Sequence, residues 1–205
     1  MTTQRNGRNP LVLLAGFVAL GVALAVLLFG GDLWRGEERL ADERETPPAG
    51  RSPFTATSGS APQIGDAPAP FTLPDFDGNL VSLADFHGRP VIVNFWATWC
   101  APCRVEMPEF QAIYEAYQDE GLIILALNQD EPLVIARRYF YDEMALTFTP
   151  LQDERRLVAA EYGAFLTMPT TYFINGEGLV TAVHRGPLTQ SQLENYLSLT
   201  LDERG

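Results

Sequence analysis

The chain has 205 residues, with 26 acidic side chains against 14 basic ones and a formal net charge of −12. Such an acidic chain, in which the basic residues form no cluster, excludes the electrostatic footprint of a nucleic-acid-binding protein. Its two cysteines are too few for a disulfide scaffold or a four-cysteine zinc site. The length allows one hydrophobic core together with accessory segments.

A short polar tail, residues 1–10, precedes an apolar stretch at residues 11–29 that carries no charge. At about 1.5 Å per residue, this stretch is long enough to cross a hydrocarbon core of roughly 30 Å. A cleaved signal peptide would need a small-x-small site, and Ala23-Leu24-Ala25 fits that pattern. The apolar run continues past this site, so we predict an uncleaved transmembrane anchor and keep cleavage after Ala25 as the alternative.

Arginines flank the apolar stretch on both sides, so the positive-inside rule does not decide its orientation. Arg5 and Arg8 precede the stretch, and Arg35, Arg39 and Arg44 follow it. We predict a single-pass protein of the cell membrane, and the very short tail and the signal-like layout favour a soluble part outside the cytoplasm. We expect the rest of the chain to lie on the extracytoplasmic side.

Residues 30–63 mix charges with Pro, Gly, Ser and Thr and show no apolar periodicity, which predicts a flexible linker. The folded domain is expected over residues 64–205. It should begin with a β-hairpin, because residues 71–73 and 80–82 are strand-like and flank a turn containing Asp, Gly and Asn.

The remaining elements are expected to alternate between strand and helix. We predict strands at 91–97 and 122–127, helices at 100–120, 132–144 and 154–162, a hairpin of strands 170–174 and 179–183, and a closing helix at 191–199. Pro108 should kink the first of these helices because it removes a backbone donor. This order predicts an α/β fold, a mixed sheet with helices on both faces.

The sequence Cys100-Ala101-Pro102-Cys103 lies where the first buried strand gives way to the first long helix. A helix N-terminus presents unpaired N–H groups and a partial positive charge, both of which stabilise a thiolate. In such motifs the cysteine pKa falls below the free value of about 8.5. Pro102 suits the first turn, where its missing N–H has no cost. Because two cysteines at this spacing can close a disulfide or open to a dithiol, we predict a redox site.

The motif Trp-Cys-Ala-Pro-Cys at residues 99–103 resembles the active site of thioredoxin. A second segment, Met-Pro-Thr at residues 168–170, precedes a strand in the way that the cis-proline loop of that fold does. The resemblance implies a cis peptide bond before Pro169. It also implies a substrate groove formed by Trp99, Pro102, Met168, Pro169 and Thr170.

Within the thioredoxin-like fold, the chain resembles the membrane-anchored TlpA/ResA type of thiol–disulfide oxidoreductase, in the AhpC/TSA–redoxin superfamily. The supporting segments are Ile-Gly-Asp-Ala-Pro-Ala-Pro-Phe at 64–71, Asn-Phe-Trp-Ala-Thr-Trp at 94–99 and Glu-Met-Pro at 106–108. The resemblance implies protein thiols and disulfides as substrates and a membrane protein as electron donor. Cytochrome c maturation is one role that it suggests. No metal and no cofactor beyond the Cys100–Cys103 disulfide are expected.

Asn94 stands where thioredoxin has a buried aspartate, and an asparagine cannot act as a general base. Proteins of the ResA type use a glutamate that corresponds to Glu106. The spacing agrees, because Glu106 follows Cys103 by three residues and both can lie on one helix face. A partly desolvated carboxylate with a raised pKa could accept the Cys103 proton. The alternative is an exposed acid that is favoured by the helix dipole.

We therefore expect Cys100 to attack a substrate disulfide as a thiolate and Cys103 to resolve the mixed disulfide. Three alternatives stay open. A peroxiredoxin-like peroxidase normally has Thr-x-x-Cys without a second cysteine three residues later. A thioredoxin-like copper-binding chaperone usually has Cys-x-x-x-Cys and a liganding histidine. An oxidase would use the same two cysteines but transfer electrons in the opposite direction, from the substrate to this protein.

Two histidines and one acidic pair are given simpler roles. His87 and His184 have no cysteine-rich or histidine-rich neighbourhood, so we expect surface or packing positions for them. Asp130 and Glu131 follow the second buried strand at its C-terminal end, where they could border the site, but acids at the start of a helix are the simpler interpretation.

Overall fold

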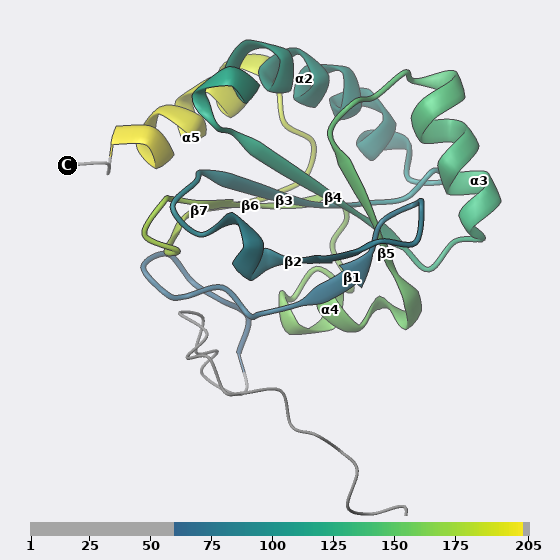
Figure 1. The fold of residues 1–205 in the computed structure, drawn as a ribbon, viewed down its shortest axis with the longest axis horizontal. Coiled ribbons are helices and arrows are strands. Elements are labelled where there is room, and N and C mark those ends of the chain that lie inside the picture. The colour runs from purple at the N-terminus through teal and green to yellow at the C-terminus, as the bar shows by residue number, and fades with distance from the viewer. Residues whose placement is uncertain (1–59, 203–205) are drawn as a thin grey trace, which may run out of the picture. The chain divides into compact units, whose positions relative to one another are not determined.

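The computed structural model describes residues 60–202 (Figure 1). The predicted tail at 1–10, the predicted anchor at 11–29 and most of the predicted linker lie outside the described residues. Among the residues that are described, none belongs to a helix with the length and apolar character needed to cross a bilayer.

A five-stranded mixed sheet with the order β5-β4-β3-β6-β7 forms the centre of the domain. Its strands are β3 (Val91–Trp96), β4 (Ile123–Gln129), β5 (Thr149–Asp153), β6 (Thr170–Ile174) and β7 (Val180–Arg185). Strands β3, β4 and β5 run parallel, whereas β6 and β7 are antiparallel to their neighbours. Every residue of β3 and β4 is buried, as expected of strands covered on both faces.

Helices lie on both sides of this sheet, which confirms the predicted α/β architecture. The helical elements are η1 (Leu83–Phe86), α2 (Ala101–Tyr117), η2 (Gln118–Glu120), α3 (Leu133–Arg137), η3 (Arg138–Glu143), η4 (Glu154–Arg156), α4 (Leu157–Glu161) and α5 (Gln190–Asp202). In Figure 1, α2 and α5 lie together above the sheet and α4 lies below it. Pro108 lies inside α2, and the kink expected there stays a prediction.

Two of the predicted helices are less regular than expected. The helix predicted at 132–144 is α-helical only in α3 and continues as the π-helical segment η3. The helix predicted at 154–162 is interrupted at its start, because Arg155 and Arg156 both have a φ of 58°. A residue in the left-handed conformation cannot continue a right-handed helix. The regular α-helix of this segment is therefore limited to α4, which begins after Arg156.

Strand β1 (Thr72–Pro74) pairs antiparallel with β2 (Leu80–Ser82) ahead of the main sheet. The turn between them is closed by Asp75, whose Oδ1 accepts from the N–H groups of Asp77 and Asn79, each at 2.8 Å. Gly78 has a φ of +90° in this turn, a conformation that favours glycine.

Strand β5 was not predicted from the sequence, because it contains Pro150 and lacks a clear apolar alternation. Its place in the sheet explains why the proline is tolerated. Strand β5 pairs in parallel with β4 and is the edge strand of the sheet. An edge strand tolerates a proline, because the missing N–H need not remove a hydrogen bond to a further strand.

The side chains of β3 alternate between the two faces of the sheet, and this alternation positions the site. Val91, Val93 and Phe95 pack into one core cluster. Ile92 and Trp96 pack into another, which also contains residues of α2 and α5. Since successive side chains point to opposite faces, Asn94 shares the face of Ile92 and Trp96 and points towards α2.

Candidate active site

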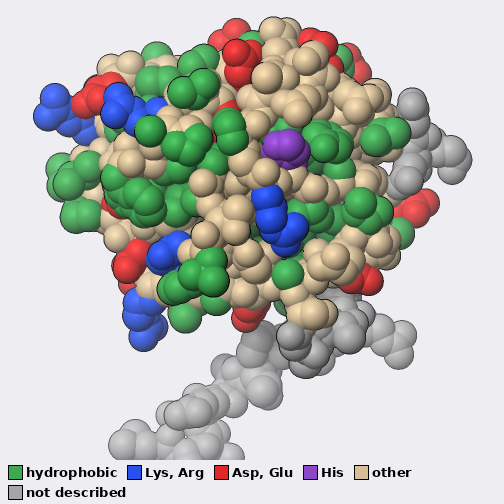
Figure 2. All heavy atoms as spheres, turned by 180° about the vertical axis from the view of Figure 1, so that it is seen from behind, with side chains coloured by type: hydrophobic (Ala, Val, Ile, Leu, Met, Phe, Trp, Pro, Cys, Tyr) green, Lys and Arg blue, Asp and Glu red, His purple; other side chains and the backbone are tan. Residues whose placement is uncertain are grey.

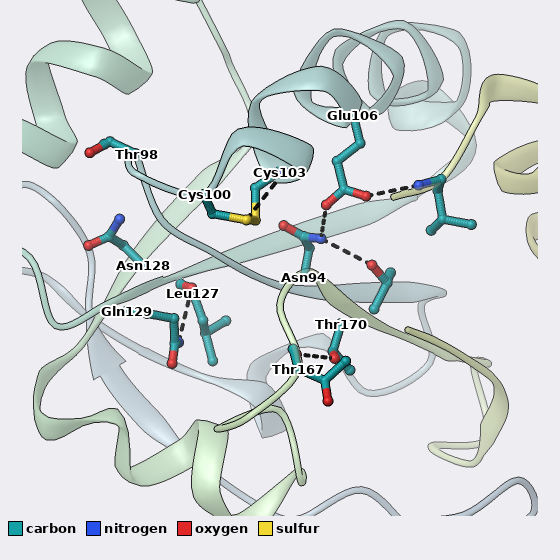
Figure 3. Close-up of a disulfide and its surroundings, with 12 residues drawn as sticks. Asn94, Thr98, Cys100, Cys103, Glu106, Leu127, Asn128, Gln129, Thr167 and Thr170 are labelled. Carbon is teal, nitrogen blue, oxygen red and sulfur yellow. Dashed lines mark hydrogen bonds between the residues drawn. A yellow bond between two sulfur atoms is a disulfide. The ribbon is translucent and has the colours of Figure 1, made fainter. Parts of the chain in front are cut away.

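Cys100 and Cys103 form a disulfide at the start of α2, with their Cα atoms 5.3 Å apart (Figure 3). Cys100 is the N-cap residue of the helix, and its Sγ accepts from the Cys103 N–H at 3.3 Å. Cys100 keeps 5% of its surface exposed and Cys103 keeps none. The predicted helix start is therefore confirmed, and Cys100 is the sulfur that a second molecule can reach.

Glu106 lies one helical turn beyond Cys103 and is fully buried. Its Oε1 accepts from Asn94 Nδ2 at 2.9 Å, and its Oε2 accepts from the Leu188 N–H at 3.0 Å. Burial raises the pKa of Glu106 to about 7, although both hydrogen bonds act to lower it. The alternative of an exposed helix-start acid is wrong. The carboxyl group can both hold and release a proton near neutral pH.

Asn94 is buried beneath α2 and connects Glu106 with the neighbouring strand β6. Its Nδ2 donates to Thr171 Oγ1 at 3.0 Å as well as to Glu106. Its Oδ1 is buried and has no hydrogen-bond partner within the described part of the chain. The sequence indicated that Asn94 cannot be a base, but it did not indicate these contacts, because they join residues far apart in the chain.

The peptide bond between Met168 and Pro169 is cis, as expected from the resemblance. Thr170 follows as the first residue of β6 and pairs in register with Phe95 near the end of β3. Since β3 and β6 are antiparallel, the end of β3 and the start of β6 meet at one edge of the sheet. The Met168–Thr170 segment and the Cys100–Cys103 motif therefore leave the sheet side by side.

Glu131 is a functional neighbour of the motif that we interpreted differently from the sequence. It does not cap α3, whose N-cap residue is Pro132. Its Oε2 accepts from the Thr98 N–H and from Asn128 Nδ2, each at 2.7 Å, and its Oε1 accepts from the Thr98 hydroxyl. Glu131 thus anchors the loop that leads into Cys100. The sequence held one signal for this contact. Thr98 follows β3 and Glu131 follows β4, and parallel strands end at the same edge of the sheet.

Replacing Glu131 with Ala is expected to lower the free energy of unfolding by about 2 kcal/mol, because the Thr98 N–H loses a charged acceptor. Urea unfolding of the full chain measures this change. Glu143→Ala is the matched control. Its carboxylate pairs with Arg138 at the surface at 3.3 Å, and such pairs contribute about 0–1 kcal/mol. Equal unfolding midpoints for the two variants would contradict the anchoring role of Glu131.

Exposed apolar side chains occur on the elements that surround the motif. Trp99 precedes Cys100 and keeps 64% of its surface exposed. Val134 of α3 and Leu166 in the loop before Pro169 are also exposed. A cavity of about 350 Å³ is lined by residues of α2, α3, η3 and the loop before Cys100. Figure 2 shows hydrophobic side chains beside arginines on one face of the molecule, a surface that suits contact with another polypeptide.

His184 lies on β7 and is half-buried, with its Nδ1 3.3 Å from the Tyr196 hydroxyl. Its ring also packs against the Tyr196 ring, with 5.8 Å between the centroids. These contacts agree with the packing position expected for this histidine.

Comparisons with known proteins find a matching family and similar thiol–disulfide oxidoreductases. A model of the AhpC/TSA family matches residues 64–183. The thiol-disulfide oxidoreductase ResA of Halalkalibacterium halodurans is 34% identical over 144 residues, which cover 70% of this chain and 81% of that protein. The protein of the same name from Oceanobacillus iheyensis is 39% identical over 140 residues, covering 66% of this chain and 72% of that protein.

Solved structures show the same similarity. A thiol:disulfide interchange protein DsbE from Chlorobium tepidum has a TM-score of 0.63 and 29% identity, covering 69% of this chain and all of that chain. StoA from Bacillus subtilis has a TM-score of 0.54 and 29% identity, covering 63% of this chain and 97% of that chain.

Proposed function

The chain belongs to the AhpC/TSA family, and on that premise we propose that it reduces protein disulfides on the extracytoplasmic side of a membrane. It is a thioredoxin-like thiol–disulfide oxidoreductase similar to ResA and DsbE. The single observation that carries the proposal is the Cys100–Cys103 pair at disulfide distance, with Cys100 at the N-terminus of α2. The direction of transfer, the membrane and the substrate are the parts that we propose.

In the proposed reaction, the Cys100 thiolate attacks one sulfur of a substrate disulfide. A Cys100–substrate disulfide forms, and the first substrate sulfur leaves and takes up a proton. Cys103 then gives its proton to Glu106 and attacks Cys100 Sγ. The Cys100–Cys103 disulfide forms as the second substrate thiol leaves, so two electrons have passed from the protein to the substrate.

The two cysteines are suited to different halves of this reaction. Cys100 is reachable, and the Cys103 N–H at 3.3 Å together with the helix N-terminus stabilises its thiolate. Cys103 is fully buried, and burial disfavours the charged thiolate. Its thiol therefore needs a nearby base to accept the proton. Glu106 is the base that we propose, because it is buried on the same helix and its pKa is raised to about 7.

A polypeptide substrate is supported by the surroundings of Cys100. Trp99 offers an exposed ring beside the disulfide. Pro102, Met168, Pro169 and Thr170 are the other residues that we assign to the groove, and Thr170, whose side chain is fully buried, would contribute through its backbone. An extended segment of substrate would lie between Trp99 and Pro102 on one side and residues 168–170 on the other, with its cysteine against Cys100. No metal or organic cofactor enters this reaction, because the disulfide itself carries the electrons.

Regeneration of the dithiol requires an electron donor, and we propose a membrane protein for this step. The predicted anchor at 11–29 and the linker at 30–63 would keep the domain within reach of such a donor. Cytochrome c maturation, with the cysteines of an apocytochrome as substrate, is the pathway that the resemblance to the ResA type suggests.

A redox titration of the full chain against glutathione and dithiothreitol tests the proposed direction. We expect a midpoint closer to that of thioredoxin, about −270 mV, than to that of the oxidant DsbA, about −120 mV. The reduced chain should also convert insulin disulfides to thiols in stoichiometric amounts. A midpoint near that of DsbA, with no reduction of insulin, would reverse the assignment and favour an oxidase.

Processing of the N-terminus tests the proposed membrane anchor. Because the apolar run continues beyond Ala25, we expect the protein isolated from its native membrane to retain residues 11–29. Mass spectrometry of the intact protein measures this directly. An N-terminus near Val26 would show that the apolar run is a cleaved signal and would remove the anchor.

A further inference from the structure

The hydrogen bonds around Glu106 restrict where its proton can reside. The Leu188 N–H that faces Oε2 belongs to the backbone and can only donate, so Oε2 must keep a lone pair directed at it. The carbonyl oxygen of a carboxylic acid is a better acceptor than its hydroxyl oxygen, so this contact favours the carbonyl at Oε2 and the proton at Oε1. That oxygen currently accepts from Asn94 Nδ2 at 2.9 Å, which is also a donor.

Two donors cannot face each other in a buried site without a large loss of hydrogen-bond energy. Protonated Oε1, when its O–H is directed along the present hydrogen bond to Asn94, therefore needs an acceptor in the position where Nδ2 now lies. The Asn94 amide provides one, because its Oδ1 is buried and has no partner among the described residues. Figure 3 shows the amide nitrogen directed towards Glu106 and the amide oxygen on the side that faces the disulfide.

We propose that the Asn94 side-chain amide rotates by half a turn whenever Glu106 Oε1 gains or loses a proton, and that Asn94 is thereby the positioning residue of the resolving step. This inference rests on the proposed function, in which Glu106 accepts the Cys103 proton. With Glu106 ionised, Oδ1 faces the cysteines and accepts from the Cys103 thiol. With Glu106 protonated, Oδ1 accepts from Oε1, and Nδ2 faces the cysteines and donates to the Cys103 thiolate.

The proton balance of the step is closed. One proton leaves Cys103 Sγ and arrives on Glu106 Oε1, and the electron pair left on the sulfur attacks Cys100 Sγ. The amide rotation adds no charge. It exchanges an acceptor beside the thiol for a donor beside the thiolate, and so stabilises the nucleophile at the moment it forms.

Thr171 makes the rotation possible because a hydroxyl both donates and accepts. It now accepts from Asn94 Nδ2 at 3.0 Å, and after the rotation it would donate to Oδ1 in the same position. Thr171 lies opposite Asn94 in the β3–β6 register, which fixes this contact. A valine of the same shape could serve neither orientation.

The titratable groups near this cluster are few. Burial accounts for the raised pKa of Glu106, and its hydrogen bonds from Asn94 and Leu188 act in the opposite direction. On α2, the cysteines precede Glu106. On β7, His184 pairs in register with Thr171, and its Nδ1 is directed at the Tyr196 hydroxyl of α5. The rotation is therefore expected to follow the titration of Glu106.

Nuclear magnetic resonance on the oxidised full chain tests the rotation directly. Below the Glu106 midpoint near pH 7, the Asn94 Hδ2 protons should show Overhauser contacts to the Cys103 β protons. Above it, they should show contacts to the Glu106 γ protons instead. Contacts that stay the same while the Glu106 carboxyl carbon titrates would overturn the proposal.

A kinetic test isolates the resolving step. Cys100 is joined to thionitrobenzoate at low pH, and release of the coloured thiol by Cys103 is followed after a jump to pH 7. We expect Thr171→Val to slow release about tenfold, as for one impaired proton-transfer contact. Thr171→Ser, which keeps the hydroxyl, should restore it. Thr181→Val, on the adjacent strand β7, is the matched control and should equal the wild type.

Asn94→Leu removes both ends of the amide at similar volume. Loss of the Nδ2 donor should move the pH midpoint of release upward by about one unit. If Thr171→Val or Asn94→Leu matches the wild type in rate and midpoint, the role of Asn94 is wrong. If Glu106→Gln also matches the wild type, the base assigned in the proposed function is wrong as well.

Discussion

Replacing Cys103 with Ser is expected to leave the chain joined to its substrates by a mixed disulfide at Cys100. The reason is the different exposure of the two sulfurs, because Cys100 reaches the surface at the helix N-terminus and Cys103 is fully buried. Without Cys103 the first attack still occurs, but no thiol remains to resolve its product. Acid-quenched samples on non-reducing gels, followed by mass spectrometry, measure the trapped species.

Cys100→Ser is the partner experiment and is expected to abolish both trapping and turnover. The double variant Cys100→Ser/Cys103→Ser supplies the background level of thiol exchange. Trapping through Cys103 in the Cys100→Ser variant would reverse the roles of the two cysteines. It would also require α2 to move, because the Cys103 sulfur has no exposed surface in the oxidised protein.

Glu106→Gln is expected to slow the resolving step about 100-fold above pH 7, the range observed when a general base is lost. In the wild type, the rate should rise as Glu106 ionises near pH 7 and then level off. In the variant this rise should be absent. The thionitrobenzoate release assay measures both, and superimposable profiles would show that Glu106 does not accept the proton.

The same substitution is expected to change how stability depends on pH. The folded protein raises the pKa of Glu106 from 4.5 to about 7, so the folded state holds the proton more tightly than the unfolded state. The stabilisation by protonated Glu106 is complete below about pH 4.5 and is lost as the pH rises through about 7. The loss amounts to about 3 kcal/mol.

Urea unfolding of the oxidised full chain at several pH values measures this slope. Glu106→Gln cannot titrate, so its unfolding free energy should not show this fall between pH 4.5 and 7. Glu115→Gln, a replacement of an exposed glutamate on the same helix, is the control and should keep the slope of the wild type. Parallel curves for wild type and Glu106→Gln would show that Glu106 titrates normally in the folded protein.

The sequence alone predicted those features that depend on short-range patterns. The apolar run from Val91 identified the central strand, because a strand covered on both faces must be apolar throughout. The helix start at Cys100 followed from the transition between this strand and a helical pattern. Resemblance to thioredoxin supplied the cis bond before Pro169, and resemblance to the ResA type supplied the importance of Glu106.

Other features were misread because local pattern is a weak guide to them. Strand β5 contains Pro150, and only its place at the end of the sheet makes that residue acceptable. The helix expected at 154–162 was shortened by the left-handed conformations of Arg155 and Arg156, which no local pattern indicated. Glu131 looked like a helix-start acid until its contacts with Thr98 were known.

The sequence by itself indicated the redox chemistry of this protein, since two cysteines at this spacing at a helix start can close a disulfide or open to a dithiol. Only the tertiary structure decided how that chemistry is controlled. The ionisation of Glu106 depends on burial and on donors from β3 and from the loop before α5, 12 and 82 residues away along the chain. Desolvation and hydrogen bonding act through space, so the sequence left a raised pKa and an exposed helix-start acid as alternatives, and burial in the folded protein decides for a pKa of about 7.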